Sequence, residues 1–297
     1  MGEAHAVGGM PTELAQLFIN GLALGGIIAL GSVGLTLVYG ILRLSNFAHG
    51  DFLTLGAYFT LWVNSWGVPV PLAMVAGCGL TIGAFVLTEV VLWGPVRRRY
   101  TSATTMMIMS IGLALFVRNG IILIWGSQNQ NYNLPVWGAV RLGAVQVTTN
   151  RMVVLGLAVI AVMALHVLLQ KTAVGRQMRA VADNPELAQV AGVDVQRVIG
   201  WTWVVAGGLT ALGGAMYGLI TAVRPNMGWF LLLPMFTTVI LGGIGNPYGA
   251  IVGALVVGVA QEMSTYWLPS EYKLGVALAV MILVLLVRPQ GLFRGTL

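Results

Sequence analysis

The stretch LAQLFINGLALGGIIALGSVGLTLVYGIL, Leu14–Leu42, decides the fold class of this chain. It holds 29 residues without a single charge, whereas a helix that crosses a membrane needs about 20. We therefore expect this helix to be tilted or to break near Gly31–Gly34. Over the whole chain, 58% of residues are hydrophobic and 8% are charged, against roughly 25% charged in soluble domains. The composition predicts an all-α polytopic membrane protein.

Further apolar runs follow at lengths that suit membrane helices. They are Phe52–Trp66, Leu72–Trp93, Met106–Trp125, Met152–Leu169, Trp201–Val223, Ala250–Trp267 and Leu274–Val287, with a short half-helix over Pro234–Leu241. Together with the first run they predict about nine transmembrane helices, within a range of eight to ten, and some broken or re-entrant segments. Residues 1–297 then form a single transmembrane domain. The loop Ser127–Asn150 is polar and shows a β-type alternation in its second half.

Positive charge sets the expected orientation, because cytoplasmic loops of membrane proteins are enriched in lysine and arginine. The nine-crossing path puts ten basic residues inside: Arg43, Arg97, Arg98, Arg99, Lys171, Arg176, Arg179, Arg197, Arg288 and Arg294. It puts four outside: Arg141, Arg151, Arg224 and Lys273. The N-terminus is then external and the C-terminus cytoplasmic. The net charge of +6 reflects this orientation, and we expect no nucleic-acid partner.

Two segments interrupt the apolar pattern. RLSNFAHGD, Arg43–Asp51, cannot face lipid, because its backbone and side chains would lack hydrogen-bond partners. LLLPMFTTVILGGIGNPYGA, Leu231–Ala250, contains a proline and then four glycines and a second proline within eight positions. Because such breaks occur where they line a cavity, their polar residues are candidates for a translocation pathway: Ser45, Asn46, His49, Thr237, Thr238 and Asn246. The alternative is that each of them only pairs freed backbone groups.

The stretch KTAVGRQMRAVADNPELAQVAGVDVQRVIG, Lys171–Gly200, contains seven of the 24 charged residues. Its helix signals are, in order, Asn184 as the N-cap, Pro185 at the first helical position, Glu186 at the positive end of the helix dipole and Gly192 beyond the last turn. The apolar side chains of Leu187, Val190 and Ala191 fall on one face of this helix. It has about two turns, too few for stability alone in water. It therefore needs a surface to pack on, either in its own bundle or on a second protein.

Ionisable residues at membrane depth are costly, at about 2.5–3.5 kcal/mol each on insertion scales. The candidates here are Asp51, Glu89, Arg118 and Glu262. We expect Asp51 to pair with Arg43 and Glu89 to cap or snorkel beside the Arg97–Arg99 cluster. Arg118 and Glu262 have no partner nearby in the sequence, so they are expected to face the bundle interior. There they serve either a pathway or a structural polar contact.

The sequence offers little chemistry for catalysis. GGIGNPYGA, 242–250, lacks the Lys-Ser/Thr ending of a phosphate-binding loop, and no nucleophile, base and orienting group form a recognisable constellation. His5, His49 and His166 have no neighbours at metal-ligand spacing. We therefore predict no enzyme activity, no metal and no cofactor bound by this chain. Pairs of glycines four residues apart, such as Gly21 and Gly25, predict close helix contacts.

Three motifs carry a family resemblance: YGILRLSNFAHGDFLTLGAY over Tyr39–Tyr58, GRQMRAVADNPELAQVAGVDVQRVI over Gly175–Ile199, and TTVILGGIGNPYGAIVGALVVG over Thr237–Gly258. In this order they resemble the permease subunits of ATP-binding-cassette importers for branched-chain and related hydrophobic amino acids, most closely the first permease of the pair. The similarity extends over nearly the whole chain, including its end, YKLGVALAVMILVLLVRPQGLFR.

The resemblance implies an importer located in a bacterial plasma (inner) membrane. Its implied partners are a second, homologous permease, two cytoplasmic ATPases that bind ATP and Mg²⁺, an external solute-binding protein, membrane lipid and an amino acid substrate. Residues 171–200 would form a cytoplasmic coupling loop whose short helix docks on an ATPase. The residues to which the resemblance assigns this role are Arg179, Asp183, Asn184, Pro185, Glu186, Leu187, Ala188 and Gly192.

Three alternatives remain open at this point. Related permeases carry urea or short amides, and the motifs do not separate them from amino acid permeases. An ion-coupled or proton-coupled transporter working alone would need no ATPase, and it would lose activity when Glu262 or Glu89 is replaced. A purely structural membrane subunit would have broken segments that line no cavity.

Overall fold

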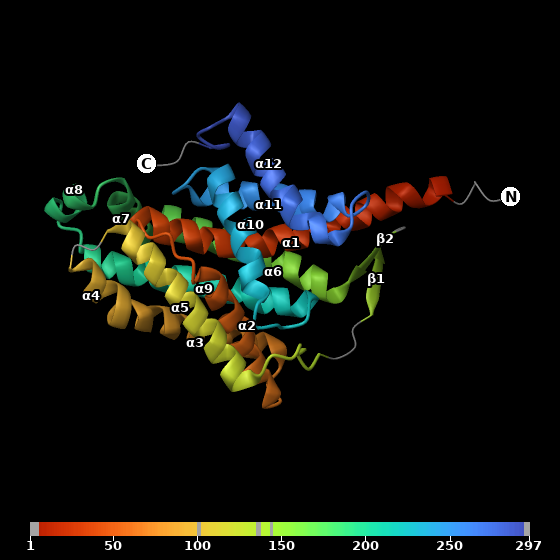
Figure 1. Cartoon of the computed structure of the whole chain (residues 1–297), viewed down its shortest axis with the longest axis horizontal. Helices are drawn as coiled ribbons and strands as arrows, with labels where there is room; N and C mark the ends of the chain where they lie inside the picture. The colour runs from red at the N-terminus through yellow and green to blue at the C-terminus, as the bar shows by residue number, and fades with distance from the viewer. Residues whose placement is uncertain (1–5, 100–101, 135–137, 143–144, 294–297) are drawn as a thin grey trace.

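The computed structural model describes residues 6–99, 102–134, 138–142 and 145–293, and this part of the chain is a helical membrane bundle with one small hairpin (Figure 1). The elements are α1 (Ala6–Leu42), α2 (His49–Ser65), α3 (Val70–Thr88), a π-helical turn η1 (Glu89–Trp93), α4 (Gly94–Arg97), α5 (Ala103–Trp125), β1 (Ala139–Leu142), β2 (Val145–Thr148), α6 (Thr149–Lys171), α7 (Ala173–Asp183), α8 (Pro185–Val190), α9 (Val195–Ile220), α10 (Met227–Gly242), α11 (Pro247–Ser264), a 3₁₀ turn η2 (Ser270–Tyr272) and α12 (Lys273–Val287). The antiparallel pairing of β1 with β2 confirms the predicted alternation. Arg294, Tyr100 and Thr101 lie outside the described residues.

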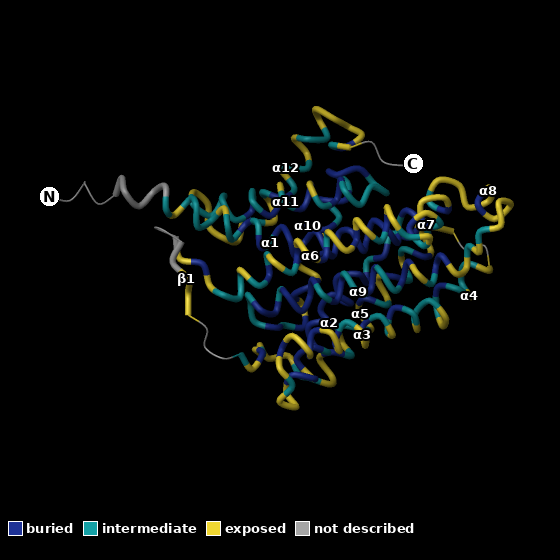
Figure 2. The backbone as a smooth tube through the Cα atoms, turned by 180° about the vertical axis from the view of Figure 1, so that it is seen from behind, coloured by how far each residue is buried: buried dark blue, intermediate teal, exposed yellow. Residues whose placement is uncertain are grey.

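Helix α1 is the centre of the bundle. It runs for 37 residues as one helix, so the alternative of a break near Gly31–Gly34 was wrong. From Gly21 onward it is almost wholly buried, and it contacts α6, α9, α10 and α11. Figure 2 shows it among the dark, buried core segments. An unbroken helix bonds its backbone groups internally, and these four helices cover its apolar side chains.

Six helices in the described residues are long and apolar enough to cross a membrane. They lie within Thr12–Leu42, Val70–Arg97, Ala103–Trp125, Thr149–Lys171, Val195–Ile220 and Ser270–Val287. The chain is thus a polytopic membrane protein. Helices α2, α10 and α11 are 17, 16 and 18 residues long and are not among these six, so nine crossings stay a prediction.

Helix α2 begins within the bundle, beside the middle of α1, and the start of α10 packs on the start of α2. After Leu42 the chain turns back without helix until Ala48, and the His49 side chain then meets the Gly31 carbonyl at 2.9 Å. Helix α10 crosses α1 steeply (Figure 1). The expected half-helix start at Pro234 was wrong, because α10 begins at Met227 and Pro234 lies inside it. Packing of α10 on α2, α11 and α12 offsets the one hydrogen bond that proline removes.

Glycines allow these helices to approach closely. A Cβ on Gly258 would meet the Cα of Gly25 at 2.5 Å, and Gly21 meets the backbone of α11 in the same way. These contacts confirm the first of the predicted glycine pairs. Gly79 and Gly83 differ, because nothing lies within 4 Å of a Cβ built at either position. Such tight contact is how membrane helices gain packing energy without a hydrophobic effect between them.

The crossing of α2 and α10 gives a test of this packing. A Cβ at Gly228 would lie 2.6 Å from the Gly50 carbonyl carbon and 2.6 Å from the Thr54 Oγ1. Gly228→Ala should therefore destabilise the protein by about 1–3 kcal/mol, the usual cost of overpacking. Gly79→Ala is the matched control and should be neutral or slightly stabilising, since alanine favours helix by about 0.5–1 kcal/mol. Thermal unfolding in detergent measures both, and equal melting temperatures would refute the packing argument.

Candidate functional site

Helix α8 forms as the sequence predicts. The Asn184 Oδ1 accepts hydrogen bonds from the backbone N–H groups of Glu186 and Leu187, each at 3.0 Å, and Pro185 occupies the first helical position. At the other end Gly192 has φ +86°, a left-handed conformation that glycine adopts without a Cβ penalty. The Val193 N–H closes the motif on the Ala188 carbonyl at 2.9 Å. Local capping therefore defines both ends of this helix.

The outer face of α8 lacks a partner in the described chain. Ala188 is only 4% exposed and packs in a small core with Met178 and Val181 of α7. In contrast, Leu187 and Val190 are 66% and 87% exposed. Figure 1 shows α8 at the far end of the molecule, beyond the ends of the long helices. One side of α8 is thus anchored, and the other presents aliphatic groups to the surroundings.

Most of the other predicted coupling residues surround this face, but Arg179 has a second contact. Asp183, Asn184, Pro185, Glu186 and Gly192 are exposed. Arg179 donates a hydrogen bond to the Leu169 carbonyl near the end of α6, where it satisfies one of the carbonyls that a helix end leaves free. Arg179 therefore ties α7 to α6.

A pocket of about 310 Å³ lies behind the coupling segment. Its wall combines Arg179 and Asp183 of α7 with Asn246 and Tyr248, at the start of α11. The Tyr248 hydroxyl also contacts the His166 Nδ1 on α6 at 3.0 Å. The coupling segment and the second glycine-rich break are therefore neighbours in space, although they are far apart in the sequence.

The six predicted pathway residues do not all lie together, because Asn246 is apart from the others. Ser45 lines a pocket of about 170 Å³, together with residues of α1 and α10. Asn46, His49, Thr237 and Thr238 are buried, in the region where α1, α2 and α10 meet. Asn246 instead caps α11, its Oδ1 accepting from the N–H groups of Tyr248 and Gly249.

Several of these buried groups contact other helices. The His49 Nε2 lies 2.9 Å from both the Gly31 carbonyl and the Thr210 hydroxyl, and the Thr238 hydroxyl lies 2.6 Å from that of Ser32. Ser32 and Thr210 were not predicted as part of this region, since a lone hydroxyl inside an apolar run carries no signal. Among the described atoms the Asn46 Nδ2 and Thr237 Oγ1 are buried without a hydrogen-bond partner. The pathway assignment stays a prediction.

The ionisable residues at membrane depth all form ion pairs. Asp51 was expected to pair with Arg43, but it pairs with Arg118. The Arg118 Nε and Nη2 lie 2.8 and 3.0 Å from the two carboxylate oxygens of Asp51. Glu89 pairs with Arg97, as the sequence suggested, and also accepts from the Trp203 indole at 2.6 Å. Asp51 does not reach Arg43, because the chain turns back after Leu42 and α2 then places the Asp51 side chain beside α5.

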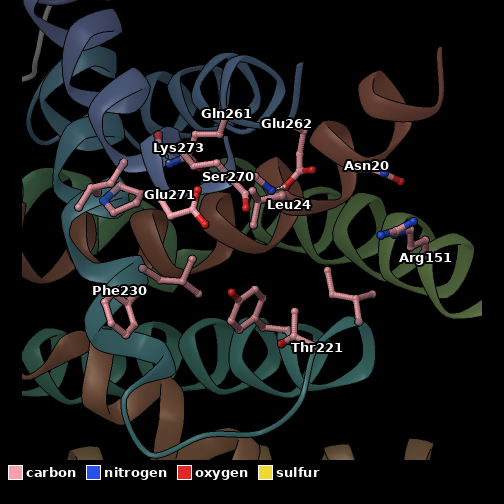
Figure 3. Close-up of a pocket in the computed structure, with 15 residues that line it drawn as sticks. Asn20, Leu24, Arg151, Thr221, Phe230, Gln261, Glu262, Ser270, Glu271 and Lys273 are labelled. Atoms are coloured by element: carbon pink, nitrogen blue, oxygen red, sulfur yellow. Dashed lines mark hydrogen bonds and ion pairs between the residues drawn. The ribbon is translucent and has the colours of Figure 1, made fainter. Parts of the chain in front are cut away.

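A second polar pocket (Figure 3) is lined by the end of α9, whereas α8 lies next to the start of that helix. It has a volume of about 410 Å³ and carries Glu262, whose carboxylate pairs with Lys273 at 2.5 Å. The expectation that Glu262 faces inward is met, with a partner on the next helix. Arg151 and Glu271 also line this pocket. Among the described residues, no three His, Cys, Asp or Glu side chains are grouped to hold a metal ion.

A bundle of membrane-length helices, with partly buried ion pairs and polar pockets near both ends, fits a membrane transport subunit. Residues 17–285 match the family described as "Branched-chain amino acid transport system / permease component". The chain belongs to this family.

Relatives agree with this assignment. The high-affinity branched-chain amino acid transport system permease protein LivH of Salmonella typhimurium is 32% identical, with 94% of each chain covered. The corresponding BraD of Pseudomonas aeruginosa is 30% identical, over 93% of this chain and 94% of BraD. The solved structure of PsaBC from Streptococcus pneumoniae in complex with Fab superposes with a TM-score of 0.54 at 13% identity, covering 97% and 96% of the two chains. That likeness concerns the fold alone.

The pair of Asp51 and Arg118 gives a second test. Replacing either partner alone, by Asp51→Leu or Arg118→Met, leaves a charge without its partner and should destabilise the protein by about 3–5 kcal/mol. The double variant removes both charges and should lose much less than the sum. Thermal unfolding in detergent completes the double-mutant cycle, with Glu13→Gln as the exposed control. Additive losses would show that the two side chains are not coupled.

Proposed function

We propose that this chain is a permease subunit of an ATP-binding-cassette importer that moves branched-chain or other hydrophobic amino acids into the cell. The observation that carries this proposal is the capped helix α8, which presents Leu187 and Val190 outward while Ala188 anchors it. The names of LivH and BraD supply the substrate class. Urea or short amides are the alternative cargo, but the names of these relatives do not favour it.

The proposal includes partners and a location. The chain works with a second homologous permease, two cytoplasmic ATPases that hold ATP and Mg²⁺, and an external solute-binding protein, in a bacterial inner membrane. It forms one transmembrane domain over residues 1–297, with residues 171–200 as its coupling loop. Nine crossings, with an external N-terminus, place α8 in the cytoplasm. ATP is then hydrolysed on the ATPases, and the helices of this chain move in response.

Movement of a docked ATPase is transmitted to the permease first through α8 and then through α7. Because Ala188 packs on α7, and Arg179 of α7 is bonded to the end of α6, movement of a docked ATPase displaces α6 and α7 together. The pocket behind them borders Asn246, where the chain turns from α10 into α11. Gly243 and Gly245 have φ +100° and +87° in that turn, so it bends without straining a side chain. The outcome is alternating access through rocking of the helices.

Docking through α8 predicts a separation between folding and coupling. Replacing Leu187 and Val190 by serine removes two aliphatic groups, each worth about 1.5–3 kcal/mol when fully buried. The ATPases should dissociate at least tenfold more readily and transport should fall, while the melting temperature of the permease stays unchanged. Gln189→Ser is the control on the same helix, because Gln189 is exposed and polar. Unchanged transport and ATPase association in the double variant would refute the docking role.

The substrate class is tested by reconstitution. The chain, co-purified with its ATPases, second permease and solute-binding protein, should accumulate labelled leucine, isoleucine or valine in proteoliposomes only when ATP is present. Uptake of urea instead would identify the alternative cargo. Uptake driven by an ion gradient without ATPase would contradict the importer mechanism.

A further inference from the structure

A groove of about 700 Å³ separates α3 from α6. Both helices contact α9, whose Leu212 and Leu219 form the floor of the groove, but α3 and α6 have little or no contact with one another. Val75 and Gly79 of α3 line the groove and are exposed, so its mouth opens at the side of the bundle. All three helices lie within segments that are long and apolar enough to cross a membrane. The mouth therefore opens into the hydrocarbon of the bilayer.

The wall of the groove is almost wholly apolar. Apart from Asn150 and the thiol of Cys78, its side chains are aliphatic, proline or methionine. The Asn150 Nδ2 is already bonded, because it donates to the Leu219 carbonyl at 3.1 Å. None of the described residues that line the groove is charged. A polar solute would find no partners inside it, whereas a hydrocarbon chain needs none.

Glycine keeps this groove open. Gly79 and Gly83 stand four residues apart, a spacing that often brings membrane helices into close contact. Here a Cβ built at either position meets no atom within 4 Å, and Gly79 lines the groove. An empty space against a protein surface forfeits the dispersion contacts of the atoms around it. Within a bilayer, the molecules at hand to supply those contacts are lipids.

The length of the groove matches one leaflet of the membrane. Along α3 it extends from Val70, the first residue of that helix, to Ile82, which is about 18 Å at 1.5 Å per residue. The hydrocarbon core is about 30 Å thick, so each leaflet contributes about 15 Å. Asn150 and Leu219 mark the same end of the groove on α6 and α9. A membrane helix from another subunit would need a groove along the full thickness of the bilayer.

We propose that an acyl chain of a phospholipid occupies this groove and replaces the missing contact between α3 and α6. Its headgroup lies at the end marked by Val70, Asn150 and Leu219, which is the external surface under the proposed orientation. The site recognises the chain and not the headgroup, because the described lining carries no charge that would select one headgroup. The site depends on the membrane helices and the gap between them, so it is independent of the cargo.

Photocrosslinking tests the site on the full chain in nanodiscs, with a phosphatidylcholine that carries a diazirine in one acyl chain. Cys78, the sole cysteine, and Met74 line the groove and report its occupancy. Met74 is 5% exposed, so a lipid adduct on it requires a chain inside the groove. Phe116, 76% exposed on α5, reports ordinary contact with the bilayer. Adducts should form at all three residues, and strong labelling of Phe116 without adducts at Met74 and Cys78 would overturn the site.

A pair of glycine variants then shows whether the chain enters through the groove. Gly79→Leu places a side chain in the space of the acyl chain and should lower the adducts at Met74 and Cys78, relative to Phe116, at least about tenfold. Gly83→Leu is the matched control on the same helix, because Gly83 also has open space around it but does not line the groove. It should leave the ratio unchanged. Melting temperatures no lower than that of the wild type show that both variants are folded, and equal adduct ratios in the two variants would contradict the proposal.

Two further comparisons separate the acyl chain from other occupants. A diazirine phosphatidylglycerol with the same chains should label Met74 and Cys78 as strongly as the phosphatidylcholine, and a preference of about tenfold or more for either lipid would overturn recognition by the chain alone. The labelling is repeated on the transporter assembled with its second permease. Lipid adducts that persist there support the site, whereas their loss would show that the partner permease covers the groove and would overturn the lipid as its occupant.

Discussion

Backbone polar groups inside this bundle must find partners within the protein, because lipid supplies none. The return of the chain after Leu42 depends on this constraint most directly. Ser110 supports the non-helical residues before α2, because its hydroxyl accepts from the Phe47 N–H at 3.0 Å while donating to the Met107 carbonyl of its own helix at 2.6 Å. His49 then bonds α1 and α9. Without these contacts α2 could not start in the middle of the bundle, and α10 would lose the surface that it crosses.

The sequence predicted those features whose causes are local. Helix α8 was placed correctly because its cap, its proline and its terminal glycine act within a few residues of one another. The pairing of Glu89 with Arg97 lay within one helical stretch. Asp51 was assigned to the wrong arginine, since its true partner is 67 positions away and only the chain path brings them together. Pro234 was wrongly predicted to start a helix, because the packing that stabilises α10 around this proline involves other helices and cannot be predicted from the proline alone.

The candidate site followed the same division. Helix α8 and its apolar face were predicted from the sequence, which left open whether the bundle or a second protein covers that face. The pocket at the far end was not predicted, because its charges come from separate helices and are isolated in the sequence. Helices α6 and α9 link the two ends. Helix α6 begins beside Arg151 and ends at the Leu169 carbonyl that Arg179 holds, and α9 starts next to α8 and ends at the pocket. Because these helices are continuous, a displacement at the α8 end also displaces their residues at the pocket.

The turn between α10 and α11 is restrained by hydrogen bonds to the segment after α12. Its glycines permit bending, but the end of α10 is also bonded to the last described residues of the chain. The N–H groups of Leu292 and Phe293 donate to the carbonyls of Leu241 and Gly242 at 2.7 and 3.3 Å, and Gly291 supports this approach with φ +81°. These bonds satisfy carbonyls that the helix end leaves free, so breaking them is costly. If the turn bends at its glycines, the segment after α12 therefore moves together with the end of α10. Helix α12 then moves with α10, although it lies at the edge of the bundle.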